Sequence, residues 1–145
     1  MARFLSLLVS VVCVAACALA APMHRRQTGD LQCNLARLQV VSSVSSAQTL
    51  LGQINSTDLS TTTAVAVAQA GISSINNAVQ SILSAVLVNG TAPAASRTQL
   101  SAGLDQARSA VSSIIEPSAA SIAQAAAAAL LDAGKAGDVV VAGCK

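Results

Sequence analysis

Residues 65–86, VAVAQAGISSINNAVQSILSAV, decide the fold of this protein. Their apolar side chains recur at spacings that alternate between three and four residues, at Val65, Ala68, Ile72, Ile75, Val79, Ile82 and Val86, which we call the apolar seam. This heptad spacing is typical of one face of an α-helix and excludes a β-strand, whose side chains alternate with a period of two. Residues 58–63 offer capping hydroxyls and carboxylates, and Asn89-Gly90 is a stop signal. The pattern therefore predicts a helix over residues 61–88.

A similar spacing precedes this segment and predicts a first helix over residues 31–54. It starts after Asp30, and its expected buried face consists of Leu31, Leu35, Leu38, Val41, Val44, Ala47, Leu51 and Ile54. Residues 55–57 would form the connection to the second helix.

Two further helical segments follow. Residues 96–99, SRTQ, resemble a capping box that opens a third helix, which continues through Leu100, Leu104, Ala107, Val111 and Ile114. Pro117 should break or kink it, because proline lacks the backbone donor and crowds the preceding turn. Ser118 can cap a fourth helix that Gly134 and Gly137 terminate. We expect residues 138–145 to form a short tail whose three valines pack back on the bundle.

These segments favour an all-α protein, a small antiparallel helical bundle of three to four helices tied by one terminal disulfide. The disulfide is expected because only Cys33 and Cys144 follow the export signal described below, and two thiols in an exported chain normally pair. Free or intermolecular thiols are the alternative.

The first 26 residues predict export. Residues 1–20 combine Arg3, an apolar run and a small-residue end at Ala20, which together are typical of a signal peptide. Residues 21–26 form a short propeptide that ends in the dibasic pair Arg25-Arg26, although such a pair can also be a solvated linker. We therefore expect a single helical domain over residues 27–145, secreted and without a transmembrane anchor, since a spanning helix needs about 20 strongly apolar residues.

The domain lacks the side chains from which most active sites are built. The only aromatic residue, both methionines and the only histidine all precede Gln27: they are Phe4, Met1, Met23 and His24. We therefore expect no catalytic residues, no cofactor, no metal site and no enzymatic activity. The domain also carries one acidic side chain more than it has basic ones, so we expect no nucleic-acid partner.

Two sequons predict a glycoprotein. Asn55-Ser56-Thr57 and Asn89-Gly90-Thr91 both fall in expected connections between helices, where the chain is accessible to modification.

The outer face expected for residues 61–88 is neutral, with no charge between Asp58 and Arg97. Helices of this kind could lay their apolar faces on another apolar phase without exposing charge to it. The alternative is an ordinary bundle whose outer face is rich in serine and threonine.

The signal, the dibasic site, the start of the domain at QTGDLQC and the closing Cys144-Lys145 resemble small secreted proteins of filamentous, particularly mushroom-forming, fungi. The composition is also similar to the hydrophobic surface-binding and cell-wall mannoprotein group, whose members are helical bundles. This resemblance implies a secreted or cell-wall protein that binds apolar surfaces or small lipophilic molecules. The alternative function is an effector or signalling-type protein that acts through a protein partner, whose identity the residues do not indicate.

Overall fold

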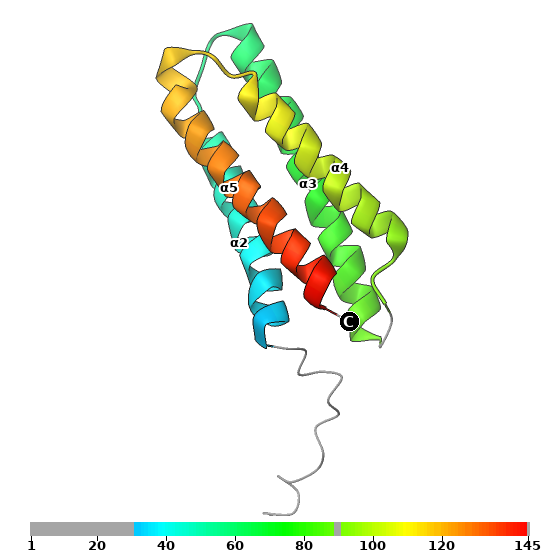
Figure 1. Ribbon diagram of the computed structural model, residues 1–145. Coiled ribbons are helices and arrows are strands. Elements are labelled where there is room, and N and C mark those ends of the chain that lie inside the picture. The colour runs from blue at the N-terminus through cyan, green and yellow to red at the C-terminus, as the bar shows by residue number, and fades with distance from the viewer. Residues whose placement is uncertain (1–30, 89–90, 145) are drawn as a thin grey trace, which may run out of the picture.

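The computed structural model describes residues 31–88 and 91–144 and confirms an all-α fold. In this part of the chain there are four helices: α2 (Leu31–Gly52), α3 (Leu59–Leu87), α4 (Ala94–Ser112) and α5 (Pro117–Gly143). They run alternately up and down, so that each helix is antiparallel to the next one along the chain (Figure 1). The predicted antiparallel bundle is thereby confirmed in its four-helix form.

The start of α3 follows from its capping residue. Asp58 has an extended backbone, and its carboxylate accepts a hydrogen bond from the Thr61 backbone N–H at 2.8 Å. This bond satisfies one of the backbone donors that the first turn of a helix leaves without a partner. The helix consequently begins at Leu59, two residues before its expected start.

The predicted starts of the last two helices were wrong. Pro93 precedes α4, so the helix begins at Ala94, and Ser96 is a buried residue inside it instead of a cap. The expected break at Pro117 is confirmed, since α4 ends at Ser112 and Pro117 is the first residue of a separate helix, α5, where its missing N–H costs nothing. Ser118 caps no backbone group there, and its hydroxyl donates to the Glu116 carboxylate at 2.7 Å.

The predicted end of the last helix was also wrong. α5 continues through Gly134 and Gly137 to Gly143, and residues 138–143 are helical instead of forming a tail. Each glycine costs a helix about 1 kcal/mol relative to alanine. Packing of α5 along α2, and the disulfide at its end, offset that cost.

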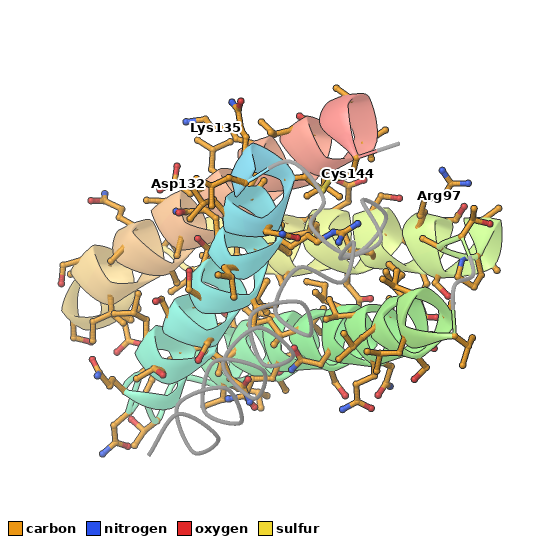
Figure 2. All side chains as sticks on the ribbon, turned by 90° about the horizontal axis from the view of Figure 1, so that it is seen from below. Arg97, Asp132, Lys135 and Cys144 are labelled. Atoms are coloured by element: carbon orange, nitrogen blue, oxygen red, sulfur yellow. A yellow bond between two sulfur atoms is a disulfide. The ribbon has the colours of Figure 1, made fainter. Side chains whose placement is uncertain are left out.

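The four helices form two pairs. α2 packs along α5 and α3 packs along α4, whereas the contacts between the two pairs are much fewer and join only α4 with α5 and, to a smaller extent, α2 with α3. Figures 1 and 2 show the same division from two directions, with the first and last helices together and the two middle helices together. We call them the outer pair (α2 and α5) and the inner pair (α3 and α4), from their order in the chain.

The core is built largely from small side chains. Alanine is the commonest of its residues, which are Val40, Val44, Ala47, Leu51, Ala64, Ala68, Ile72, Ile75, Leu104, Ala107, Ala110, Val111, Ile114, Ala119, Ala123, Ala126, Leu130, Ala133 and Ala136. Within the inner pair, the backbones of α3 and α4 touch at Gly71 and Gly103, where no side chain separates them. Small side chains let helices approach closely but bury little apolar area per residue.

Candidate functional site

One end of the bundle carries the disulfide. α2 begins and α5 ends there, and Cys33 and Cys144 are joined with their α-carbons 5.5 Å apart, as predicted. α3 ends and α4 begins at the same end (Figure 1). We call it the disulfide end.

The outward face of α2 at the disulfide end is apolar, contrary to the sequence-based expectation. Leu31, Leu35, Leu38 and Val41 were expected in the core, but all four are exposed. α2 instead buries the face that holds Cys33, Ala36, Val40, Ser43, Val44, Ala47 and Leu51. Apolar residues occur on both faces of this helix, so their spacing alone could not identify the buried one.

The residues of the apolar seam of α3 become less buried toward the disulfide end. Ile72 and Ile75 are buried, whereas Val65, Val79, Ile82 and Val86 are only partly buried. Beside the seam, Leu83 is 57% exposed and Leu87 is 73% exposed, whereas Ile75 is 0% exposed. Toward this end the seam residues are therefore only partly covered, and the leucines beside them face solvent.

These residues give the disulfide end a group of exposed apolar side chains, among which Arg37, Arg97 and Asp138 are also exposed. We define the apolar end as the exposed side chains that three helices bring there: Leu31, Leu35 and Leu38 of α2, Leu83, Leu87 and Val88 at the end of α3, and Val139 and Val141 of α5. The valines of α5 were expected to pack back on the bundle, but these two face solvent because the helix continues through them. In Figure 2, Asp132 and Lys135 lie along α5, and Arg97 lies at the start of α4, at the disulfide end.

The opposite end holds a hydrogen-bond network between two connections, beside the exposed apolar side chains of Leu59 and Ile115. The Ser56 hydroxyl, in the α2–α3 connection, donates to the carboxylate of Glu116, in the α4–α5 connection. Ser56 also accepts from the Asp58 backbone N–H at 3.0 Å. The hydrogen bonds from Ser56 and then Ser118 lower the pKa of Glu116, and the Thr61 backbone bond lowers the pKa of Asp58. We call this the polar end.

The sides of the bundle carry two open grooves. One, of about 430 Å³, lies between α2 and α5 and is bordered by the Asp132–Lys135 ion pair at 3.6 Å. The other, of about 600 Å³, lies between the start of α3 and the end of α4 and includes Leu59, Val67 and Ala110. Both are open to solvent, and neither encloses a group of side chains suited to nucleophilic or acid–base catalysis. Among residues 31–88 and 91–144, no three His, Cys, Asp or Glu side chains gather as metal ligands.

The remaining sequence-predicted sites are distributed as follows. Asn55 is exposed in the α2–α3 connection, at the polar end. Asn89, Ala20, Arg25 and Arg26 lie outside the described residues. Sequence reasoning missed the contact between Ser56 and Glu116, which are 60 positions apart.

Comparison with known proteins identified no relative of this chain. No protein-family model matches the chain, and neither a curated protein nor a solved structure is significantly similar to it. Within the described part of the chain, no helix combines the length and the apolar character needed to cross a bilayer.

Proposed function

We propose that this is a secreted, non-enzymatic protein that binds apolar surfaces or small lipophilic molecules at or near the fungal cell wall, and that the apolar end is its contact surface. The observation that carries the proposal is the concentration of exposed leucine and valine at the disulfide end. Exposed leucine and valine side chains gathered at one end are unfavourable in water, and large exposed apolar areas are commonly interaction sites.

The distribution of polar groups supports this orientation. The Ser56–Glu116 network and the sequon at Asn55 lie at the end opposite to the apolar end. The hydrogen-bonding groups of this end can stay in water while the apolar end contacts an apolar phase, and the exposed Leu59 and Ile115 beside them provide the internal comparison for the test below.

The proposal is tested by adsorption of the secreted protein to octadecyl-coated silica beads. The triple variant Leu35→Gln, Leu38→Gln, Leu87→Gln removes apolar side chains from the apolar end. The matched control is Leu59→Gln, Val67→Gln, Ile115→Gln, whose side chains are also exposed (79%, 41% and 84%) but lie elsewhere on the bundle. We expect the first variant to lose most of its adsorption and the control to keep it. Equal adsorption by the two variants would reject the apolar end as the contact surface.

A second measurement covers small ligands. Saturable binding of a fluorescent fatty acid to the wild-type protein, reduced by the apolar-end substitutions and not by the control substitutions, would extend the site to single lipophilic molecules. Absence of both adsorption and fatty-acid binding in the wild type would reject the proposed function.

A further inference from the structure

The two helix pairs are joined to each other by the polypeptide at one end only. The chain passes from the outer to the inner pair through residues 53–58, and returns through residues 113–116. Both connections lie at the polar end, where Ser56 and Glu116 are hydrogen-bonded. The α3–α4 connection lies within the inner pair, and the Cys33–Cys144 bond lies within the outer pair.

Packing divides the molecule in the same way. Each pair is held by extensive contacts along its length, with the backbone contact of Gly71 and Gly103 in the inner pair and the disulfide in the outer pair. Close backbone approaches between the pairs are few, although side chains of all four helices share one apolar core. Separating the pairs would therefore keep the close backbone packing inside each pair and uncover the shared core.

The core that separation would uncover contains no charge. Among the described residues the buried polar side chains are Ser43, Thr61 and Ser96, and none of their atoms is both buried and without a hydrogen-bond partner. In water the exposed apolar area would draw the pairs together again. Contact with an apolar phase removes the free-energy cost of exposing the core to water, because the phase covers the apolar area that separation uncovers.

We infer that the protein binds an extended apolar surface by parting its two helix pairs about the polar end, so that the surface meets the core faces of both pairs. This inference rests on the proposed function and specifies its mechanism. The apolar end makes the first contact, since Leu83 and Leu87 are exposed there beside seam residues of α3 that are only partly buried. The Ser56–Glu116 end then acts as the hinge. The surface selects the open arrangement because only that arrangement offers it the core faces.

The first test measures distances between spin labels on introduced cysteines, in solution and on octadecyl-coated silica. Gln39→Cys with Ser84→Cys reports across the pairs near the disulfide end. Ser84→Cys with Thr98→Cys reports within the inner pair, and Thr49→Cys with Ser109→Cys reports across the pairs near the hinge. All five positions are exposed.

Adsorption should lengthen the Gln39–Ser84 distance by about 10 Å or more, since the pairs must separate by roughly one helix diameter. The Thr49–Ser109 distance should change much less, and the Ser84–Thr98 distance should not change. An unchanged Gln39–Ser84 distance in adsorbed protein would overturn the inference.

The second test locks the molecule closed. A bifunctional maleimide that joins Gln39→Cys to Ser84→Cys should slow adsorption by about tenfold or more, because opening precedes full contact. The same reagent joining Ser84→Cys to Thr98→Cys should leave the rate unchanged. Equal rates for both cross-linked proteins, with adsorption retained, would reject opening but keep the proposed function. Failure of the uncross-linked protein to adsorb would reject the proposed function itself.

Discussion

The backbones of α3 and α4 touch where the two helices cross, at Gly71 and Gly103. A Cβ atom placed on Gly71 would lie 2.8 Å from the Gly103 carbonyl oxygen, and one placed on Gly103 would lie 2.9 Å from the Gly71 carbonyl oxygen. Most of the neighbouring groups are backbone atoms, which cannot move aside as the end of a flexible side chain can, and the side chains of Ala107 and Ile75 also lie close. The close approach of α3 and α4 therefore depends on the absence of a side chain at both positions.

The first prediction compares glycines that are packed with glycines that are open. Gly71→Ala and Gly103→Ala should each destabilise the protein by about 1–3 kcal/mol, because the added methyl group forces the helices apart. Gly134→Ala and Gly137→Ala are matched controls, since a Cβ there meets nothing within 4 Å. They should stabilise α5 by about 0.5–1 kcal/mol through higher helix propensity. Urea unfolding followed by circular dichroism measures all four, and stabilisation by Gly71→Ala or Gly103→Ala would contradict the close crossing.

The second prediction concerns acid. The pKa of Glu116 in the folded protein lies below its ordinary value of 4.5, mainly through the hydrogen bond from Ser56 and also through that from Ser118. A lowered pKa means that the ionised form favours folding. This contribution is fully present above the unfolded pKa and is lost as pH falls through the folded pKa. Wild-type stability should decline below about pH 4.5.

Glu116→Gln should reduce that acid dependence without abolishing it, because Asp58 also has a lowered pKa. Thermal unfolding between pH 2 and pH 7 checks this. An identical pH profile for wild type and Glu116→Gln would show that the contact between the two connections does not contribute to the pH dependence of stability.

The third prediction places a charge in the core. Ile75 is fully buried, and Ile75→Asp leaves an unpaired carboxylate there, at a cost of about 3–5 kcal/mol. Cooperative unfolding should be lost. Ser73→Asp is the control, because Ser73 is an exposed residue on the same helix. A melting curve for Ile75→Asp that matches the wild-type curve would show that Ile75 does not lie in the core.

The fourth prediction separates the disulfide from helix formation. The Cys33–Cys144 bond spans 111 positions, and closing a loop of this size is worth about 4–5 kcal/mol in the loop-entropy model. Cys33→Ser with Cys144→Ser should lower the unfolding midpoint but leave the far-ultraviolet circular dichroism in water largely unchanged. The helices persist because α2 and α5 also pack along their lengths. Complete loss of the helical signal would show that the outer pair depends on the disulfide alone.

Local sequence determined the helical class, the approximate positions of the helices and the cysteine pairing of this protein. The seam from Val65 to Val86 has a period that only a helix satisfies, and it places Ile72 and Ile75 in the core. Asp58 marks the start of α3 through a hydrogen bond made within one turn. The pairing of Cys33 with Cys144 followed because the other two cysteines, Cys13 and Cys17, lie in the predicted signal peptide. Each of these features depends on neighbours in the chain or on a choice among very few residues.

Tertiary packing alone decided which face of α2 is buried, how far α5 extends and how the helices pair. Leu35 and Ala36 are adjacent, and only the position of α5 determines that Ala36 turns inward while Leu35 faces solvent. α5 runs through Gly134 and Gly137 because packing against α2 outweighs the low helix propensity of glycine. The contacts of Gly71 with Gly103 and of Ser56 with Glu116 join residues far apart in the chain. Spacing along a single helix carries no information about its partner, so the apolar end and the two pairs emerge only when the helices assemble.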